Sequence, residues 1–164
     1  MVRRKRNQYS DSPPMTLALL AIALILALAY SAQPVFSAFH QNVERANVDS
    51  MLDRLHLAVT AYSEQCLAED KLPKACNPFT LLNPPPANYL GVQSEPTLHA
   101  LPTGCWCFVD EFKWIAYRPL HQIYNGVRYG DSNLVIYVVS PVQGQPGRTG
   151  IRLVQPPRFS YAWK

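Results

Sequence analysis

Four cysteines carry the clearest chemical potential in this 164-residue chain, at positions Cys66, Cys76, Cys105 and Cys107. Thiols can form disulfides, ligate a metal or exchange electrons. Zinc is disfavoured because the spacing lacks paired C-x-x-C ligands. A thiol–disulfide exchange site is disfavoured because C-W-C within a strand is neither a C-x-x-C motif nor a helix start. The even number favours structural disulfides if this part of the chain is exported.

The pairing of these cysteines stays open. A local Cys66–Cys76 bridge would staple the end of a helix to the following loop, and it is our preferred arrangement. A Cys105–Cys107 bridge would strain a strand, because side chains two residues apart point the same way yet splay apart. Cys66 also continues an apolar helix stripe, so a bridge from Cys66 to either sheet cysteine is a serious competitor.

The acid–base residues form no catalytic pattern. Asp110 and Glu111 are adjacent carboxylates of the kind found in solvated turns, and no G-x-S-x-G, P-loop or glycine-rich dinucleotide turn occurs. The histidines are scattered without the spacing of an H-E-x-x-H site, at His40, His56, His99 and His121. We therefore expect a non-enzymatic protein with no cofactor, no metal and no small-molecule substrate.

The element that positions everything else is an apolar N-terminal segment. An uncharged run covers Ser12 to Phe39, and its portion 15–39 would form a helix of about 37 Å, enough to cross a hydrocarbon core of about 30 Å. The basic tetrad 3–6 precedes it, which predicts a cytoplasmic N-terminus. The sequence thus predicts a single-pass protein of the bacterial inner membrane with a periplasmic C-terminal domain.

A cleaved signal peptide is the alternative, with Ala29-Tyr30-Ser31 as a weak cleavage site. The apolar stretch exceeds the usual signal-peptide core of about 7–15 residues, and apolar character continues to Phe39. We favour a retained anchor. The net charge of +4 comes largely from the basic tetrad, so the remainder does not resemble a nucleic-acid-binding surface.

Beyond the span, a helical period of apolar residues predicts an exported amphipathic helix over 40–68. Its apolar stripe is Val48, Met51/Leu52, Leu55, Ala58/Val59, Tyr62 and Cys66. The polar residues that occupy much of the rest are Glu44, Arg45, Asp49, Asp53, Arg54 and Glu64. The stripe must pack on another element, and the later apolar strands are the expected partner.

The rest of the chain divides into a Pro-rich loop (69–103) and a sheet with an aromatic tail (104–164). The loop is expected to hold one short helical turn at 78–82. Strands are expected at 105–109 and 112–118, joined by Asp110-Glu111, and at 133–140 and 151–155. With a cytoplasmic stub at 1–14 and the span at 15–39, this is an α+β fold. A long N-terminal helix, half in the membrane and half exported, packs on a small antiparallel β-sheet.

Two stretches carry a more specific pattern. N-P-F-T-L-L-N-P-P-P-A-N-Y-L-G occupies 77–91, followed by G-C-W-C-F at 104–108 and W-I-A-Y-R at 114–118. Alternation directs Trp106 and Phe108 to one face of their strand, toward the helix stripe, and directs Ile115 and Tyr117 likewise. The motif residues are Asn77, Pro78, Pro85, Pro86, Asn88, Tyr89, Gly91, Trp106, Phe108, Tyr117 and Arg118.

These motifs, within residues 15–140, resemble those of small pilin-like proteins of the mannose-sensitive haemagglutinin (MSHA) type IV pilus and of pseudopilins of related type II secretion systems. The resemblance implies a lollipop plan of membrane helix, exported helix and sheet. Type IV prepilins are cut after a glycine and carry a glutamate soon afterwards. This chain has no glycine before Gly91 and no acidic residue between Asp11 and Glu44.

What the resemblance implies is therefore an accessory component of assembly more than a major fibre subunit. Its expected partners are the membrane and pilin-like or secretion-machinery proteins, contacted through the transmembrane helix and the exported domain. Nucleic acid is not an expected partner. The alternative function is a membrane-anchored periplasmic binding or chaperone-like module of the cell envelope.

Overall fold

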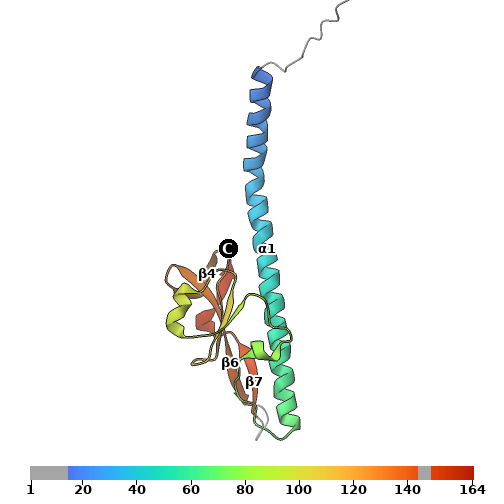
Figure 1. The fold of residues 1–164 in the computed structure, drawn as a ribbon, viewed down its shortest axis with the longest axis vertical. Coiled ribbons are helices and arrows are strands. Elements are labelled where there is room, and N and C mark those ends of the chain that lie inside the picture. The colour runs from blue at the N-terminus through green and yellow to red at the C-terminus, as the bar shows by residue number, and fades with distance from the viewer. Residues whose placement is uncertain (1–14, 144–148) are drawn as a thin grey trace, which may run out of the picture. The chain divides into compact units, whose positions relative to one another are not determined.

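A computed structural model describes residues 15–143 and 149–164 and confirms the expected α+β class (Figure 1). The predicted cytoplasmic stub, with its basic tetrad, lies outside the described residues. The described chain divides into two compact units between His40 and Gln41. Each unit is described by itself below.

One helix, α1 (Met15–Ala68), runs through both units and ends where the apolar period predicted. In the first unit its side chains are exposed almost throughout. An 18-residue window of α1 has a mean hydropathy of 2.3, and α1 is long and apolar enough to cross a membrane. No part of that window is buried inside the protein. This segment is therefore compatible with a single-pass membrane anchor.

The second unit packs the remainder of α1 beside a mixed sheet (Figure 1). The main sheet has the order β1-β2-β3-β6-β5, with β7 also paired to β6, and a separate ribbon joins β4 to β8. The bounds are β1 Tyr89–Gln93, β2 Trp106–Val109, β3 Trp114–Tyr117, β4 Ile123–Asn125, β5 Val127–Tyr129, β6 Ser132–Gln143, β7 Thr149–Val154 and β8 Tyr161–Trp163.

The expectation of a wholly antiparallel sheet needs one correction. β1 pairs with β2 in parallel, with a bulge between Tyr89 and Val92. β1 belongs to the stretch expected to be a Pro-rich loop, which also holds two 3₁₀ helices, η1 (Pro78–Leu81) and η2 (Glu95–Ala100). η1 confirms the short helical turn expected there. β1 and β2 are consecutive strands joined by a crossover, residues 94–105, and a parallel pair of this kind leaves no hairpin signal in the sequence.

The β2–β3 hairpin has the expected strands but a longer turn. Val109 pairs with Trp114, so the connection is four residues and not the two that were expected. Lys113 adopts a positive φ of 56°, and its Nζ lies 2.6 Å from Asp110 Oδ1. This ion pair closes the wider turn.

Two apolar clusters cover the opposite faces of the sheet. Trp106, Phe108, Ile115 and Tyr117 join the α1 stripe in the first cluster, as alternation predicted. Residues between them in the strands, including Cys107, belong to the second cluster. The buried positions on α1 include Val48, Leu52, Leu55 and Val59 as expected, followed by Ser63.

Ser63 is buried because the sheet approaches α1 closely there. The Ile151 amide donates to Ser63 Oγ at 3.2 Å. A Cβ atom at Gly150 would lie 3.1 Å from the same oxygen. The small residue in β7 thus permits a close contact between helix and sheet, in which a serine hydroxyl satisfies a buried strand amide.

Candidate functional site

The motif residues of the Pro-rich segment are brought together as an aromatic row. Asn77 Oδ1 accepts from the Phe79 amide at 3.1 Å, which caps η1, and Asn77 Nδ2 donates to the Tyr89 hydroxyl at 2.7 Å. The Tyr89 ring stacks on Phe79 with centroids 4.1 Å apart, and Phe79 lies 6.1 Å from Trp106. Trp106 in turn lies 4.5 Å from Tyr117. The row connects the loop, β1, β2 and β3.

Further motif residues hold the β1 end of this row. Asn88 Nδ2 donates to the Gly104 carbonyl at 2.6 Å, and the Asn88 carbonyl accepts from the Trp106 amide at 2.9 Å. The Pro86 carbonyl accepts from the Tyr89 amide at 3.0 Å. Pro78 and Phe108 are buried nearby, whereas Pro85 remains exposed. These residues therefore act first as a scaffold that fixes the Pro-rich segment to the sheet.

Arg118 is held within a separate set of contacts. Its guanidinium donates to the carbonyls of His99 and Leu101 at 3.2 and 2.7 Å. It also donates to Ser132 Oγ from Nε at 3.2 Å and from the second terminal nitrogen at 2.7 Å. Arg118 thus joins the end of η2 to the start of β6, because its fixed fork of donors can reach several oxygens at once.

At the other end of the aromatic row lies a buried carboxylate, Glu44 of α1, which is 5% exposed. Its Oε1 accepts from the Tyr117 hydroxyl at 2.8 Å and from the Leu120 amide at 2.6 Å. Its Oε2 accepts from the His121 amide at 3.0 Å and lies 2.5 Å from His121 Nδ1. Since a carboxylate only accepts, Nδ1 is the protonated ring nitrogen. Charge-assisted bonds of this kind offset the cost of burying the charge.

The expectation that Glu44 belongs to the solvent-facing polar set is therefore wrong. Glu44 lies four residues before Val48, which places it on the buried stripe of α1. That spacing was the signal available in the sequence. An isolated Glu at the end of an apolar stripe does not reveal which backbone amides will reach it, because those amides lie more than seventy residues away.

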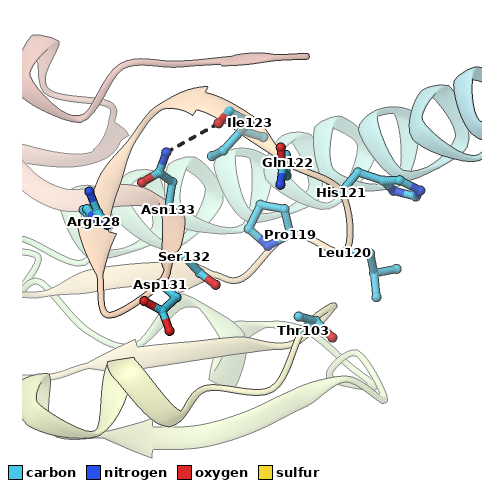
Figure 2. A pocket seen from close by; sticks show the side chains of 10 residues that line it. All are labelled: Thr103, Pro119, Leu120, His121, Gln122, Ile123, Arg128, Asp131, Ser132 and Asn133. Carbon is cyan, nitrogen blue, oxygen red and sulfur yellow. Dashed lines mark hydrogen bonds between the residues drawn. The ribbon is translucent and has the colours of Figure 1, made fainter.

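Glu44 binds the segment 118–122, which joins β3 to β4 and which we call the strap. The strap also forms one wall of a polar cavity of about 370 Å³. Figure 2 shows Arg128 and Asn133 at one end of the group of lining side chains and His121 at the other, directed away from them. The lining residues are Thr103, Pro119, Leu120, His121, Gln122, Ile123, Arg128, Asp131, Ser132 and Asn133.

Burial dominates the electrostatics around this core. Burial raises the pKa of Tyr117 well above its usual value, and the hydrogen bond to Glu44 adds to the effect. Burial also raises the pKa of the Cys107 thiol to about 12, with a smaller contribution from Cys105. Tyr117 therefore stays a protonated donor to Glu44 at neutral pH, and Cys107 is neither a ready nucleophile nor a ready metal ligand.

The cysteines occur as free thiols, so the expected disulfides stay a prediction. Cys107 is fully buried in the second cluster and Cys105 packs against it. Cys76 lies half-buried, and its pKa is raised by burial, with a further contribution from the nearby Cys66. The two sheet cysteines belong to the apolar cluster on the face of the sheet opposite α1, the helix that carries Cys66.

Within residues 15–143 and 149–164, no group of three or more His, Cys, Asp or Glu side chains is placed to hold a metal ion. The chain matches no protein-family model, no curated protein and no solved structure at a significant level of similarity.

Proposed function

We propose that this protein is a non-enzymatic, single-pass component of the bacterial inner membrane that assists assembly of an MSHA-like type IV pilus or of a type II secretion pseudopilus. The N-terminus would be cytoplasmic and the sheet-bearing unit periplasmic. The observation that carries the proposal is that one helix, α1, combines an apolar segment long enough to cross a membrane with a face that packs on the sheet.

The arrangement of the motif residues supports this proposal. The pattern that resembles pilin-like proteins is used as one connected scaffold, from Asn77 through the aromatic row to Tyr117. That row ends at Glu44, on the same helix that carries the span. A rigid exported unit attached to a membrane helix is suited to presenting a surface to neighbouring subunits.

The proposed mechanism is packing in two places. In the membrane, α1 associates laterally with other helices, because small residues allow close approach of helix backbones in lipid. These residues are Ala18, Ala21, Ala23, Ala27, Ala29, Ser31 and Ala32. In the periplasm, the sheet-bearing unit contacts pilin-like or secretion-machinery partners.

Deletion of the gene with complementation tests this function. Deletion should abolish or strongly reduce pilus assembly or secretion, and the full chain should restore it and co-purify a pilus or pseudopilus subunit. A second variant exchanges residues 15–39 for an unrelated single-span helix of the same length, as a control for anchoring alone. Lateral packing predicts that this variant fails to restore assembly. Unchanged assembly after deletion, with no co-purifying component, would refute the proposal.

A membrane-anchored periplasmic binding or chaperone-like module is the second candidate. The polar cavity beside the strap favours it, because hydroxyl, amide and charged side chains line it. This alternative predicts that pili and secretion survive deletion, while Arg128→Ala and Asn133→Ala reduce capture of an envelope component by the full chain. The first candidate predicts no such dependence on the cavity.

In the periplasm the proposal also expects a Cys66–Cys76 disulfide. These residues are ten positions apart, and closing a loop of that size would stabilise the fold by about 2–3 kcal/mol. Peptide mapping of protein taken from the envelope without reduction should detect this link. Four free thiols would refute oxidation, whereas a link from Cys66 to Cys105 would refute only the choice of partner.

A further inference from the structure

The strap holds an exposed leucine in a fixed position. Leu120 is 62% exposed, yet its amide is bound by Glu44 at 2.6 Å. Its side chain also lies against Gly104, where an added Cβ would come within 3.3 Å of it. The hydrogen bond to Glu44 fixes the backbone of Leu120, so this exposed side chain projects from a defined place on the surface.

Next to the strap are a tyrosine and a cation. Tyr124 in β4 is 55% exposed, and the Lys164 ammonium lies 5.5 Å from the centre of its ring. Lys164 Nζ also donates to Gln122 Oε1 of the strap at 2.7 Å. Leu120, Tyr124 and Lys164, which we call the strap patch, thus combine an apolar, an aromatic and a basic side chain around one short segment.

Chain length limits how far the strap can lie from the proposed membrane span. Glu44 follows Phe39, the last residue of that span, by five positions. Five residues reach at most about 18 Å even when fully extended. The headgroup region adds about 5–7 Å beyond the hydrocarbon on each side. Since Glu44 binds the strap directly, a span that ends at Phe39 keeps the strap within this chain length of the membrane surface.

We propose that the strap patch contacts the phospholipid surface of the membrane that α1 spans. Leu120 would enter the boundary between headgroups and acyl chains, and Tyr124 would lie at headgroup level, where tyrosines are enriched. Lys164 would reach lipid phosphates while its alkyl stem covers the ring. The inference rests on the proposed membrane anchoring and adds a second attachment, which restrains the exported unit from tilting.

Site-specific photo-crosslinking of the full chain in phosphatidylethanolamine–phosphatidylglycerol nanodiscs tests this contact. The photoreactive residue p-benzoylphenylalanine replaces Leu120 in one variant and Leu57 in a matched control. Leu57 is 72% exposed and lies about 20 Å further along α1 than Glu44. Position 120 should give lipid adducts at several-fold higher yield than position 57. Because Glu44 binds the backbone at 120, circular dichroism should show both variants folded.

Two further results separate this inference from the proposed function. Carbonate extraction reports on the span alone: a chain that is released has no anchor, which overturns both proposals. A chain that resists extraction but gives equal lipid adducts at positions 120 and 57 overturns only the strap contact. In intact cells, an adduct from position 120 to a protein in place of lipid would assign the patch to a protein partner and also overturn the lipid assignment.

Discussion

Glu44 is the residue at which helix, sheet and connecting segment meet. Both carboxylate oxygens are occupied, by a side-chain hydroxyl, two backbone amides and an imidazole. A carboxylate in this position specifies one register of the strap on α1, because its removal would leave several donors without an acceptor. Apolar residues on the same stripe supply burial but no such directionality.

The first prediction follows from this geometry. Glu44→Ala should lower the free energy of unfolding by about 2–4 kcal/mol, since the amides of Leu120 and His121 lose a charged acceptor. Thermal unfolding of the full chain in micelles, followed by near-ultraviolet circular dichroism, measures this change. Glu64→Ala is the control, because Glu64 is exposed on the same helix and should change stability by less than about 0.5 kcal/mol. Equal effects of the two substitutions would contradict the anchoring role.

The buried Cys107 thiol carries a pH dependence. Its pKa rises from 9.0 to about 12 in the fold, chiefly through burial. Above pH 9 the unfolded thiol loses its proton while the folded one keeps it, so the stability contributed by the neutral thiol is full below pH 9 and is lost progressively toward pH 12. Denaturant unfolding of the reduced chain between pH 8 and 10 should therefore show falling stability. The fall should be smaller in Cys107→Ala; an identical slope in both would contradict the assignment.

At the scale of elements, the sequence predicted what depends on local period and composition. The end of α1 at Ala68, the turn η1 and the strands β2 and β3 follow from apolar spacing, a capping Asn and alternation. The elements that escaped prediction are β1, β4, β5 and β8, of which three have only three residues. Strands this short contain no measurable alternation, and they form because distant partners supply the other half of each ladder.

The candidate site was only partly predictable for the same reason. The motif residues stood out as a group, and the structure unites most of them, but Glu44 and the strap carry no motif. Glu44 and His121 are 77 positions apart, so their meeting depends on the path of all the chain between them. Charge alone argued for placing Glu44 in solvent, and the stripe spacing argued against it. Hydrogen bonds to residues far along the chain determine that Glu44 is buried. Such contacts cannot be recognised from the residues next to Glu44 in the sequence.

The corner between β4 and β5 gives a prediction at this scale. Gly126 has a φ of +80°, and a Cβ there would lie 2.8 Å from the Leu134 carbonyl oxygen. Gly91 has a similar φ of +85° with nothing near its Cβ position. Gly91→Ala should therefore cost about 1–2 kcal/mol, from backbone conformation alone. Gly126→Ala should lower the free energy of unfolding by clearly more, because the backbone at Leu134 must move to make room for the added Cβ. Thermal melts of both variants compare them, and equal losses would show that the clash is relieved without cost.

For the whole molecule, the central question is whether the apolar half of α1 remains attached to the sheet-bearing unit. α1 has a mean hydropathy of 2.3 over 18 residues, which is apolar enough for a membrane span. A signal sequence near the N-terminus can be equally apolar. Length separates the two, since the apolar segment 15–39 exceeds a signal-peptide core of about 7–15 residues. α1 also continues without a break through Pro34 to Ala68, which agrees with a retained apolar segment.

We therefore expect the mature protein to keep residues 15–39 and to remain in the membrane after alkaline carbonate treatment. Intact mass and N-terminal sequencing of protein from the envelope should show no cleavage near Ala29-Tyr30-Ser31. As a control, Ala23→Arg and Leu24→Arg together place two charges at the centre of the span, each costing about 2.5–3.5 kcal/mol in hydrocarbon. This variant should shift to the carbonate-soluble fraction. A shorter mature chain found free in the periplasm would establish the signal-peptide alternative, and the strap patch would then face water instead of lipid.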